Sequence, residues 1–359
     1  MSGATAFFYT DSMLKYYFGP EHPFQPIRYK KIFDTLTEIG AFGPSLVHIE
    51  PGPSTRDELR LVHTDTYIDR IEEICKLGTG YLDGGDTPIT ESLFEGALAV
   101  TGGTVACVDA VAKGEYQHAM TPAGGMHHAM PERGSGFCVF NDTAIAGRLA
   151  QKRYGIKRIA IIDIDAHHGD GTQEVFYNEQ VLTISFHRYG QYFYPRTGAK
   201  EEIGKGKGKG YNLNVPLPGG TQDDVYLKAY DRVVRAALDA YRPDIVIHQF
   251  GADAHFGDCI ADLGLTTKAY ERIAETTHDM VHKYGQGKYV VTGGGGYNID
   301  AVRRAWAIAT CAVSGAYPYD PEALHHLQDS LINQKANCNR EEVGEVVDYL
   351  MSEVLPLIR

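Results

Sequence analysis

The chain alternates between short apolar runs and longer segments in which apolar residues recur every three or four positions. The short runs are rich in β-branched residues, which is typical of strands buried on both faces of a parallel sheet. They predict strands over residues 3–10, 158–163, 181–186, 244–249 and 288–292, and the glycine- and lysine-rich segment 201–220 is expected to be a surface turn that leads into a further short strand. The periodic segments predict helices over residues 27–40, 64–77, 91–112, 141–151, 225–240, 267–284, 301–313 and 340–355.

Strands and helices that alternate along a chain form βαβ units around a parallel sheet. The pattern therefore predicts an α/β fold, with a mostly parallel central sheet flanked by helices on both faces. At 359 residues the chain is long enough for one large α/β domain or two smaller ones. No linker or break in composition marks a boundary, so we expect a single catalytic domain over residues 1–359.

Composition and charge narrow the classes of function. Hydrophobic residues make up 43% and charged residues 22% of the chain, which is ordinary for a globular protein. The formal net charge of −12 argues against a direct nucleic-acid partner, because no basic surplus exists to neutralise phosphates. It is compatible with a cationic substrate, but acidity is also the usual way in which a cytosolic enzyme stays soluble, and this second explanation is the favoured one.

The sequence also bears on cellular location. The first ten residues lack the basic and apolar regions of a signal peptide, and we expect no apolar run of membrane-spanning length. The six cysteines are scattered without a C-x-x-C pair, which favours a reducing compartment and argues against a zinc ribbon. We therefore expect a cytoplasmic protein without a membrane partner.

The segment from residue 158 to 172, RIAIIDIDAHHGDGT, changes abruptly from apolar to acidic and histidine-rich. Side chains alternate along a strand, so Asp163, Asp165 and His167 are expected to project to one side. Two carboxylates and an imidazole that converge in a buried place are costly unless a positive charge lies among them. The segment therefore predicts a divalent metal site, although the spacing does not choose between one ion and two.

Reactive residues also follow other predicted strands and polar loops. The loop 121–142 carries His127 and His128, a third loop ends at Asp253, and a glycine-rich loop ends at Tyr297. Ligands of an open parallel sheet bind at the carboxyl ends of its strands. We therefore expect these loops, together with the opening stretch of the chain, to meet in one crevice.

These loops resemble a known family. GPEHPFQPIR, GGMHHAMPERGSGFCVFND, DIDAHHGDGT, SFHRYGQYFYPRTG, GKGYNLNVP, QFGADAHFGD and GGGGYN occur in the family's order, between about Tyr17 and about Ala312. The chain is similar to the zinc-dependent histone deacetylases of the arginase–deacetylase superfamily, and within them to the bacterial and archaeal acetoin-utilisation deacetylases. The resemblance implies the arginase/deacetylase fold.

The resemblance implies a set of metal sites. Asp165, His167 and Asp253 match the zinc ligands, and three protein ligands leave room for water and substrate. Two carboxylates and one imidazole do not select strongly between Zn²⁺ and Fe²⁺, so Fe²⁺ stays open as the metal in the cell. A structural potassium ion is also implied, held by Asp163, Asp165, His167, Ser185 and Phe186.

Catalytic roles follow from the same resemblance. His128 matches the general base and later acid, with its ring oriented by Asp170. His127 matches an imidazole kept protonated by Asp163, which acts as an electrostatic partner. Tyr297 matches the hydroxyl that stabilises the oxyanion of the reacting amide.

The resemblance also implies a tunnel for the acyl-lysine chain. Phe137 and Tyr194 match its aromatic walls and Gly136 its floor, although the family often has Phe at position 194. Asp86 matches a rim carboxylate that binds the substrate backbone; a plain turn residue is the alternative. Arg28 matches an arginine near the acetate-release channel, and a structural salt bridge is the alternative there.

The function implied is hydrolysis of the acetamide of N-ε-acetyl-lysine in a protein or peptide. Deacetylation of acetylated polyamines or other small acetylamides is a second interpretation, weakened because Ile260 is neutral where a polyamine enzyme is expected to carry Glu. A ureohydrolase with two manganese ions and a catalytically dead acyl-lysine-binding protein are less favoured. We expect a monomer or weak homo-oligomer.

Overall fold

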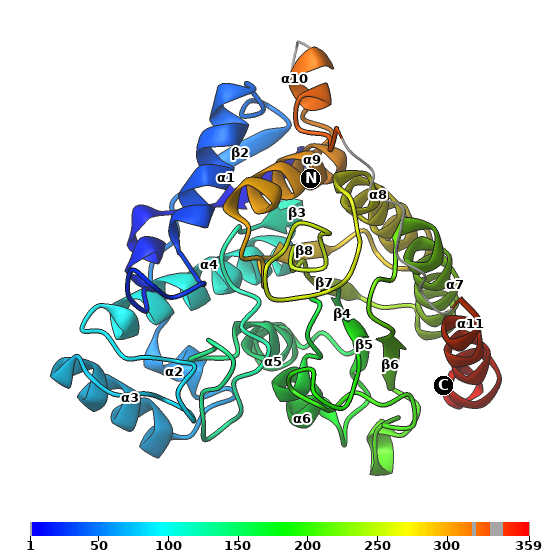
Figure 1. Ribbon diagram of the computed structural model, residues 1–359, viewed down its shortest axis with the longest axis horizontal. Helices are drawn as coiled ribbons and strands as arrows, with labels where there is room; N and C mark the ends of the chain where they lie inside the picture. The colour runs from blue at the N-terminus through cyan, green and yellow to red at the C-terminus, as the bar shows by residue number, and fades with distance from the viewer. Residues whose placement is uncertain (1, 318–320, 331–339, 359) are drawn as a thin grey trace.

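One sheet of parallel strands forms the centre of the molecule (Figure 1). The computed structural model describes residues 2–317, 321–330 and 340–358, and the strand order in this part is β2-β1-β3-β8-β7-β4-β5-β6. The strands are β1 (Ser2–Phe8), β2 (Leu46–Ile49), β3 (Tyr116–Met120), β4 (Ile159–Asp163), β5 (Leu182–Arg188), β6 (Asn212–Leu217), β7 (Ile245–Gln249) and β8 (Tyr289–Thr292). The predicted α/β class with a parallel sheet is confirmed.

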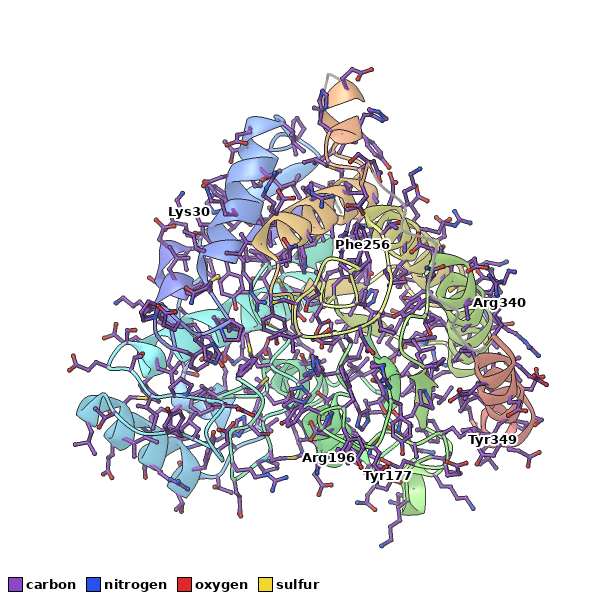
Figure 2. All side chains as sticks on the ribbon, viewed as in Figure 1. Lys30, Tyr177, Arg196, Phe256, Arg340 and Tyr349 are labelled. Carbon is purple, nitrogen blue, oxygen red and sulfur yellow. The ribbon has the colours of Figure 1, made fainter. Side chains whose placement is uncertain are left out.

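Helices cover both faces of the sheet (Figure 1). Those of one layer are α2 (Arg56–Leu59), α3 (Asp65–Leu77), α4 (Leu93–Ala112), α5 (Asp142–Tyr154) and α6 (Asp170–Phe176). Those of the other layer are α1 (Ile27–Glu38), α7 (Asp223–Tyr241), α8 (Thr267–Tyr284), α9 (Ile299–Ser314) and α11 (Arg340–Tyr349), with the short α10 (Pro321–His325) near α9. Side chains fill the space between the layers, while Lys30 and Arg340 project outward on opposite sides (Figure 2).

Local sequence signals set several helix boundaries. Thr64 caps α3 by accepting a hydrogen bond from the Tyr67 amide, and Gly78 ends that helix in the left-handed conformation, at φ 65°. Asn298 caps α9 in the same way as Thr64, through the Ala301 amide. Signals of this kind explain why the predicted helices before residue 315 agree with the observed ones to within a few residues.

The sequence patterns did not predict two of the strands, β2 and β3. β3 has the sequence YQHAM, in which polar residues come first and only the last three residues are buried. Its place between β1 and β8 is stabilised by parallel pairing on both sides, which no local pattern reveals. The predicted helix over 340–355 is shorter than expected, because α11 ends at Tyr349 and a π-helical turn follows over Leu350–Val354.

The helix α4 corrects the expectation that no segment is apolar enough for a membrane. Leu93–Ala112 has a mean hydropathy of 1.3 and sufficient length for a span, but 72% of it is buried inside the protein. It packs against β1, β3 and β8. Elsewhere on the helix, Gly96 and Gly102 let the backbone at residues 15–16 and 52–54 approach within the space of a methyl group. Its apolar composition is therefore explained by its burial in the hydrophobic core.

The strand order places four chemically important loops side by side. β3, β8, β7 and β4 are neighbours at the middle of the sheet, and all their carboxyl ends lie at the same edge. The loops that follow them carry His127 and His128, Tyr297, Asp253, and Asp165 with His167, respectively. The topology thus brings together segments that are far apart in the sequence.

Asp329 ties the segment after α10 to the helical layer and leads to a stability prediction. Its buried carboxylate lies 3.0 Å from Nε2 of His255 and 2.6 Å from Nη1 of Arg304, and it accepts a hydrogen bond from the Thr267 amide. We expect Asp329→Ala to lower the free energy of unfolding at pH 7 by about 3 kcal/mol, since it leaves the buried His255 and Thr267 donors without a partner and takes one of two carboxylates from Arg304. Urea denaturation measures this change.

The carboxylate of Asp329 should also make the free energy of unfolding depend on pH. Burial alone would raise the pKa of Asp329, but His255, the Thr267 amide and Arg304 outweigh it and hold the pKa well below its ordinary value. Its contribution is therefore present above the unfolded-state pKa near 4 and is lost as the pH falls below that value. The matched control is Asp348→Ala, which removes an exposed pair with Arg232 and should cost under about 0.5 kcal/mol. Equal stability of the two variants would contradict the prediction.

Candidate metal centre and active site

Asp165, His167 and Asp253 come together at the carboxyl edge of the sheet. Asp165 and His167 follow β4, and Asp253 follows β7. Nδ1 of His167 lies 2.9 Å from Oδ2 of Asp253 and 3.2 Å from Oδ1 of Asp165. All three side chains are buried, and one ligand atom of each lies within 4.8 Å of the others.

The remaining carboxylate oxygens of this cluster are held by hydrogen bonds. Gln249 and the Gly295 amide donate to Oδ2 of Asp165, over 2.8 and 2.7 Å. The Ala166 amide donates to Oδ1 of Asp253 over 2.7 Å. These donors keep Oδ1 of Asp165 and Oδ2 of Asp253 pointed toward His167, as outer-shell partners of metal ligands do.

The cluster fits a divalent cation. Burial, together with the neighbouring Asp165, raises the pKa of Asp253 well above its ordinary value, because two negative charges face each other there. Burial alone would lower the pKa of His167, but its bonds to the two carboxylates raise it to about 10. A proton on His167 thus supplies the positive charge that a metal ion would supply instead.

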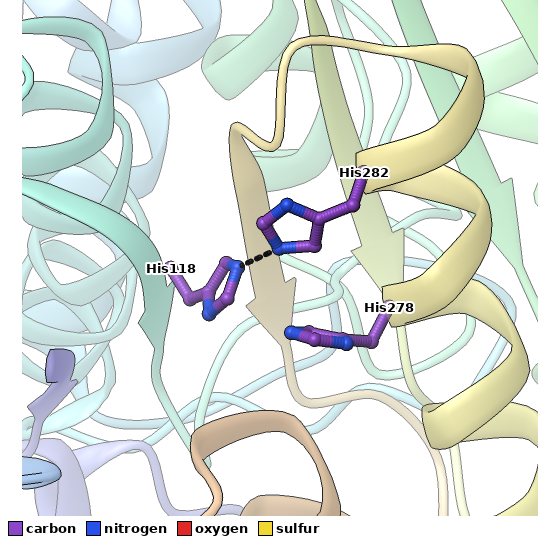
Figure 3. A group of neighbouring side chains, drawn as sticks. All are labelled: His118, His278 and His282. Atoms are coloured by element: carbon purple, nitrogen blue, oxygen red, sulfur yellow. Dashed lines mark hydrogen bonds between the residues drawn. The ribbon is translucent and has the colours of Figure 1, made fainter. Parts of the chain in front are cut away.

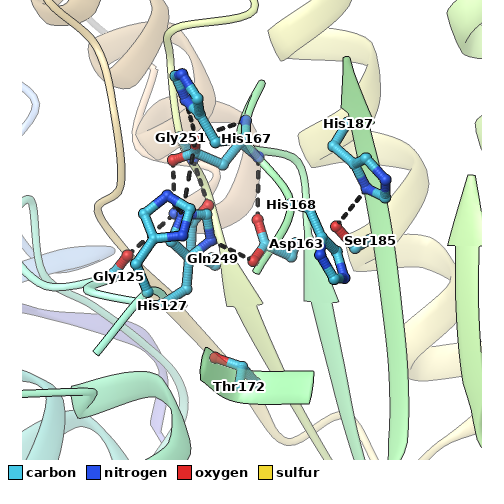
Figure 4. Close-up of polar contacts among 12 residues, drawn as sticks. Gly125, His127, Asp163, His167, His168, Thr172, Ser185, His187, Gln249 and Gly251 are labelled. Atoms are coloured by element: carbon cyan, nitrogen blue, oxygen red, sulfur yellow. Dashed lines mark hydrogen bonds and ion pairs between the residues drawn. The ribbon is translucent and has the colours of Figure 1, made fainter. Parts of the chain in front are cut away.

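Asp163 corrects the expectation that three alternating side chains share one side. β4 ends at Asp163, and beyond it the chain leaves the strand, so the strand alternation does not extend to Asp165 and His167. Asp163 accepts a hydrogen bond from His127 over 2.7 Å (Figure 4). Asp165 and His167 instead face Asp253. A turn in which the His167 amide donates to Asp165 brings those two together.

His127 and His128 form two parallel histidine–carboxylate pairs. Nδ1 of His127 lies 2.7 Å from Oδ2 of Asp163, and Nδ1 of His128 lies 2.7 Å from Oδ1 of Asp170, the first residue of α6. Since a carboxylate only accepts, each Nδ1 carries a proton and each Nε2 is directed away from its carboxylate. The two Nε2 atoms lie 3.0 Å apart.

The two imidazoles differ in protonation. Burial alone would lower the pKa of His127, but the carboxylates of Asp163 and Asp165 raise it to about 9. Burial and the positive charge of His127 lower the pKa of His128 to about 4, against the opposing effect of Asp170. At neutral pH this pair therefore holds one imidazolium, His127, and one neutral imidazole, His128.

Tyr297 lines the same small pocket as the histidine pair and Asp165. Its amide donates to the half-buried carboxylate of Asp258 over 2.8 Å, and this bond holds the end of the glycine-rich loop. Burial, with the charges of Asp253 and Asp165, raises the pKa of Tyr297 well above its ordinary value. Its hydroxyl therefore stays protonated and available as a donor.

Gly136, Phe137 and Tyr194 surround the mouth of this pocket. A Cβ atom on Gly136 would lie 2.6 Å from the His128 ring and 2.9 Å from the Tyr194 ring, so only glycine fits between them. Phe137 adopts a φ of 65°, rare for a non-glycine residue, and the hydroxyls of Thr87 and Tyr16 bind its amide and carbonyl. Tyr194 packs edge-on against His128 and is 39% exposed.

Asp86 and Ile260 lie on exposed loops, as a rim position requires. The carboxylate of Asp83 accepts the Asp86 amide, and His22 bonds the Asp86 carbonyl while its ring packs edge-on against Phe137. These two hydrogen bonds fix the backbone of Asp86 and therefore the position from which its carboxylate projects. Ile260 is 37% exposed, in a turn held by Asp258.

Arg28 is fully buried behind the site. Its Nη1 donates to the Gly296 carbonyl over 2.7 Å, and its guanidinium lies 4.0 Å from the Phe24 ring centroid. Among the described residues no carboxylate forms an ion pair with it, and its Nη2 has no hydrogen-bond partner. The alternative of a structural salt bridge is therefore wrong within this part of the chain, and a free donor remains for an anion.

Several supporting residues were missed by the sequence analysis. Gln249 donates to the Gly125 carbonyl (Figure 4) and to Asp165. Asp142 accepts hydrogen bonds from the amides of Gly125 and Met126. Phe193 stacks on His167, with ring centroids 4.9 Å apart. Only Gln249 had a signal in the sequence, because it is a polar residue at the end of a predicted buried strand.

Comparison with known proteins identifies the family. The family model described as Histone deacetylase domain matches residues 22–313. The chain belongs to the histone deacetylase family. It is 40% identical over 323 residues to the acetoin utilization protein AcuC of Bacillus subtilis (strain 168), a match that covers 88% of this chain and 83% of that protein.

Other similar proteins support the same family assignment. AcuC of Staphylococcus xylosus is 34% identical over 330 residues, which cover 89% of this chain and 84% of the relative. The crystal structure of the HDA15 HD domain superposes with a TM-score of 0.82 and 31% identity, over 98% of this chain and 99% of that one. Membership confirms the predicted family and fold, and it supports a hydrolase of the deacetylase type.

Proposed function

We propose that this histone deacetylase family member is a metal-dependent amidohydrolase that removes acetyl from the ε-amino group of lysine in proteins or peptides. The observation that carries the proposal is a small pocket lined by Asp165, His127, His128 and Tyr297, in which Asp165 also belongs to the buried cluster with His167 and Asp253. His127 is charged and His128 is neutral in this pocket. An amide is hydrolysed when a base, an acid and an oxyanion donor face the same carbonyl.

His128 is the base in this proposal. Asp170 fixes its ring through Nδ1, so that Nε2 accepts the proton of the attacking water and later delivers it to the departing lysine amine. His127, kept charged by Asp163, stabilises the negative charge that develops on the reacting carbonyl. The Tyr297 hydroxyl donates a hydrogen bond to that oxygen.

The cluster would hold the metal. A divalent ion bound by Asp165, His167 and Asp253 supplies Lewis acidity to the carbonyl and to the attacking water. We propose Zn²⁺, with Fe²⁺ as the alternative metal in the cell, since the ligand set suits both. We also retain a structural potassium ion near Asp163 and Ser185, which are in register on β4 and β5 and line a cavity rich in oxygen-bearing side chains.

Substrate contacts complete the proposal. Phe137 and Tyr194 would flank the lysine chain, with Gly136 beneath them, and Arg28 would attract the released acetate through its free Nη2. The neutral Ile260 provides no carboxylate to pair with a second amine, which favours acetyl-lysine over an acetylated polyamine. The net charge of −12 suits a basic protein segment.

Parallel kinetics test the proposal. The zinc-reconstituted protein is given an acetyl-lysine peptide and N-acetylputrescine, and kcat/KM is measured for both. We expect the peptide to be favoured by about tenfold or more, which is about 1.4 kcal/mol of transition-state discrimination. A tenfold preference for the polyamine would overturn the substrate class, and activity on neither would overturn the deacetylase proposal.

Asp86 leads to a prediction on peptide binding. We expect Asp86→Asn to raise KM for an acetyl-lysine peptide by about five- to tenfold with kcat within about twofold, because a charge-assisted hydrogen bond to the peptide backbone is lost. N-acetylputrescine has no peptide backbone, so its KM should not change. An equal change for both substrates would instead indicate that Asp86 only shapes the loop.

The proposal extends to the protein's surroundings. We propose that residues 1–359 act as one catalytic domain, as a monomer or weak homo-oligomer in the cytoplasm, with no direct nucleic-acid or membrane partner. Sedimentation velocity at micromolar concentration measures the oligomeric state, and a stable tetramer would contradict it.

A further inference from the structure

Three histidines form a cluster apart from the loops at the carboxyl edge of the sheet (Figure 3). His118 lies on β3, and His278 and His282 lie on α8. Nε2 of His118 is 2.9 Å from Nε2 of His282, and the His278 ring centroid lies 4.8 Å from that of His118 and 4.6 Å from that of His282. One ring nitrogen of each lies within 4.8 Å of the others.

The spacing of these residues matches a metal-binding pattern. His278 and His282 are four residues apart, so they share one face of α8, as the two ligands of helical zinc motifs do. The third imidazole comes from the neighbouring strand. Ligand nitrogens about 2.0–2.1 Å from a tetrahedral ion lie about 3.3 Å apart, so side-chain shifts of a few tenths of an ångström to about 1.5 Å would suffice.

Protonation does not oppose metal binding at this cluster. Burial, with the neighbouring histidines, lowers the pKa of His118 to about 3 and also lowers the pKa of His282. Neutral imidazole is the form that binds a metal. The surrounding groups are the Tyr289 ring, 6.2 Å from His118, and the Asp279 carboxylate, 3.7 Å from Nδ1 of His278.

The cluster is also accessible. His118 is buried, His278 is half-buried and His282 is exposed, so an ion can enter from solvent on the α8 side. Three protein ligands would leave a fourth position for water. Imidazole ligands suit Zn²⁺ and related transition metals and discriminate against Mg²⁺ and Ca²⁺.

We propose that His118, His278 and His282 form a second site for a divalent transition metal ion, with Zn²⁺ as the probe. The ion would connect α8 to β3, at a place where the two elements are otherwise joined by one hydrogen bond between imidazoles in the cluster. Its effect would be to stabilise the fold, independently of the pocket that holds His128 and Tyr297.

Zinc stoichiometry tests the proposal. The full untagged chain is stripped with a chelator, dialysed against buffered Zn²⁺ and assayed by mass spectrometry. We expect about two ions per wild-type chain, one per Asp253→Asn chain, one per His278→Gln/His282→Gln chain, and none when all three changes are combined. His325→Gln/His326→Gln, an exposed pair elsewhere, is the matched control and should still bind two.

A second measurement keeps the test independent of folding defects. The Asp253→Asn chain retains the three histidines, so Zn²⁺ should raise its melting temperature by about 2 °C or more, and Co²⁺ should give visible bands of a tetrahedral site. Added His278→Gln/His282→Gln changes should remove both effects. An Asp253→Asn chain that binds no zinc, or a histidine double variant that still binds two ions, would overturn the proposal.

Discussion

Asp253→Asn is expected to lower kcat/KM by at least about 10³-fold, which is about 4 kcal/mol of transition-state stabilisation. The change keeps the shape of the side chain but removes a carboxylate that faces Nδ1 of His167 at 2.9 Å. Only Asp165 and His167 then remain as charged or basic ligands. Zinc content and deacetylation of an acetyl-lysine peptide, measured on the same preparation, check the prediction.

The metal-free proteins provide the control for this variant. In wild type, burial and then the neighbouring charge of Asp165 raise the pKa of Asp253. Removing one of the two charges should therefore leave the metal-free Asp253→Asn protein at least as stable as metal-free wild type in a thermal melt. Full activity of the variant at saturating zinc would show that Asp253 is not part of the reacting site.

Tyr297→Phe is expected to lower kcat by about 10²- to 10³-fold with little change in KM. The hydroxyl would act only on the charge that develops during the reaction, and removal of one such donor costs about 2.7–4 kcal/mol. The ring, its place in the pocket and the Asp258 bond to its amide are all kept. Steady-state kinetics on the acetyl-lysine peptide measure the loss.

Tyr194→Phe is the matched control for this prediction. It removes a hydroxyl from a ring that packs on His128 in the same pocket mouth, but this ring is 39% exposed and the change leaves an apolar wall. We expect its kcat to stay within about threefold of wild type. If Tyr297→Phe were as active as Tyr194→Phe, the proposed oxyanion role of Tyr297 would be lost.

Most of the fold was predictable from local patterns. Buried strands such as β4 and β7 are continuous apolar runs, and helices such as α3 carry their own capping residues. β3 was not predictable, because its polar first half satisfies its backbone only through neighbours that lie far away in sequence. The histidine pair of α8 had a visible spacing, but its third partner lies on that unpredicted strand.

The sequence by itself determined which residue types lie at the carboxyl ends of which strands, because strand periodicity and loop composition are local properties. Only the tertiary structure decided how those residues pair. Asp163 forms a hydrogen bond with His127, whereas Asp165 and His167 face Asp253. Arg28 keeps one donor without a hydrogen-bond partner. These pairings depend on side-chain directions in loops, which are set by hydrogen bonds from distant groups such as Gln249 and the Gly295 amide. The spacing of these residues along the chain does not predict those hydrogen bonds.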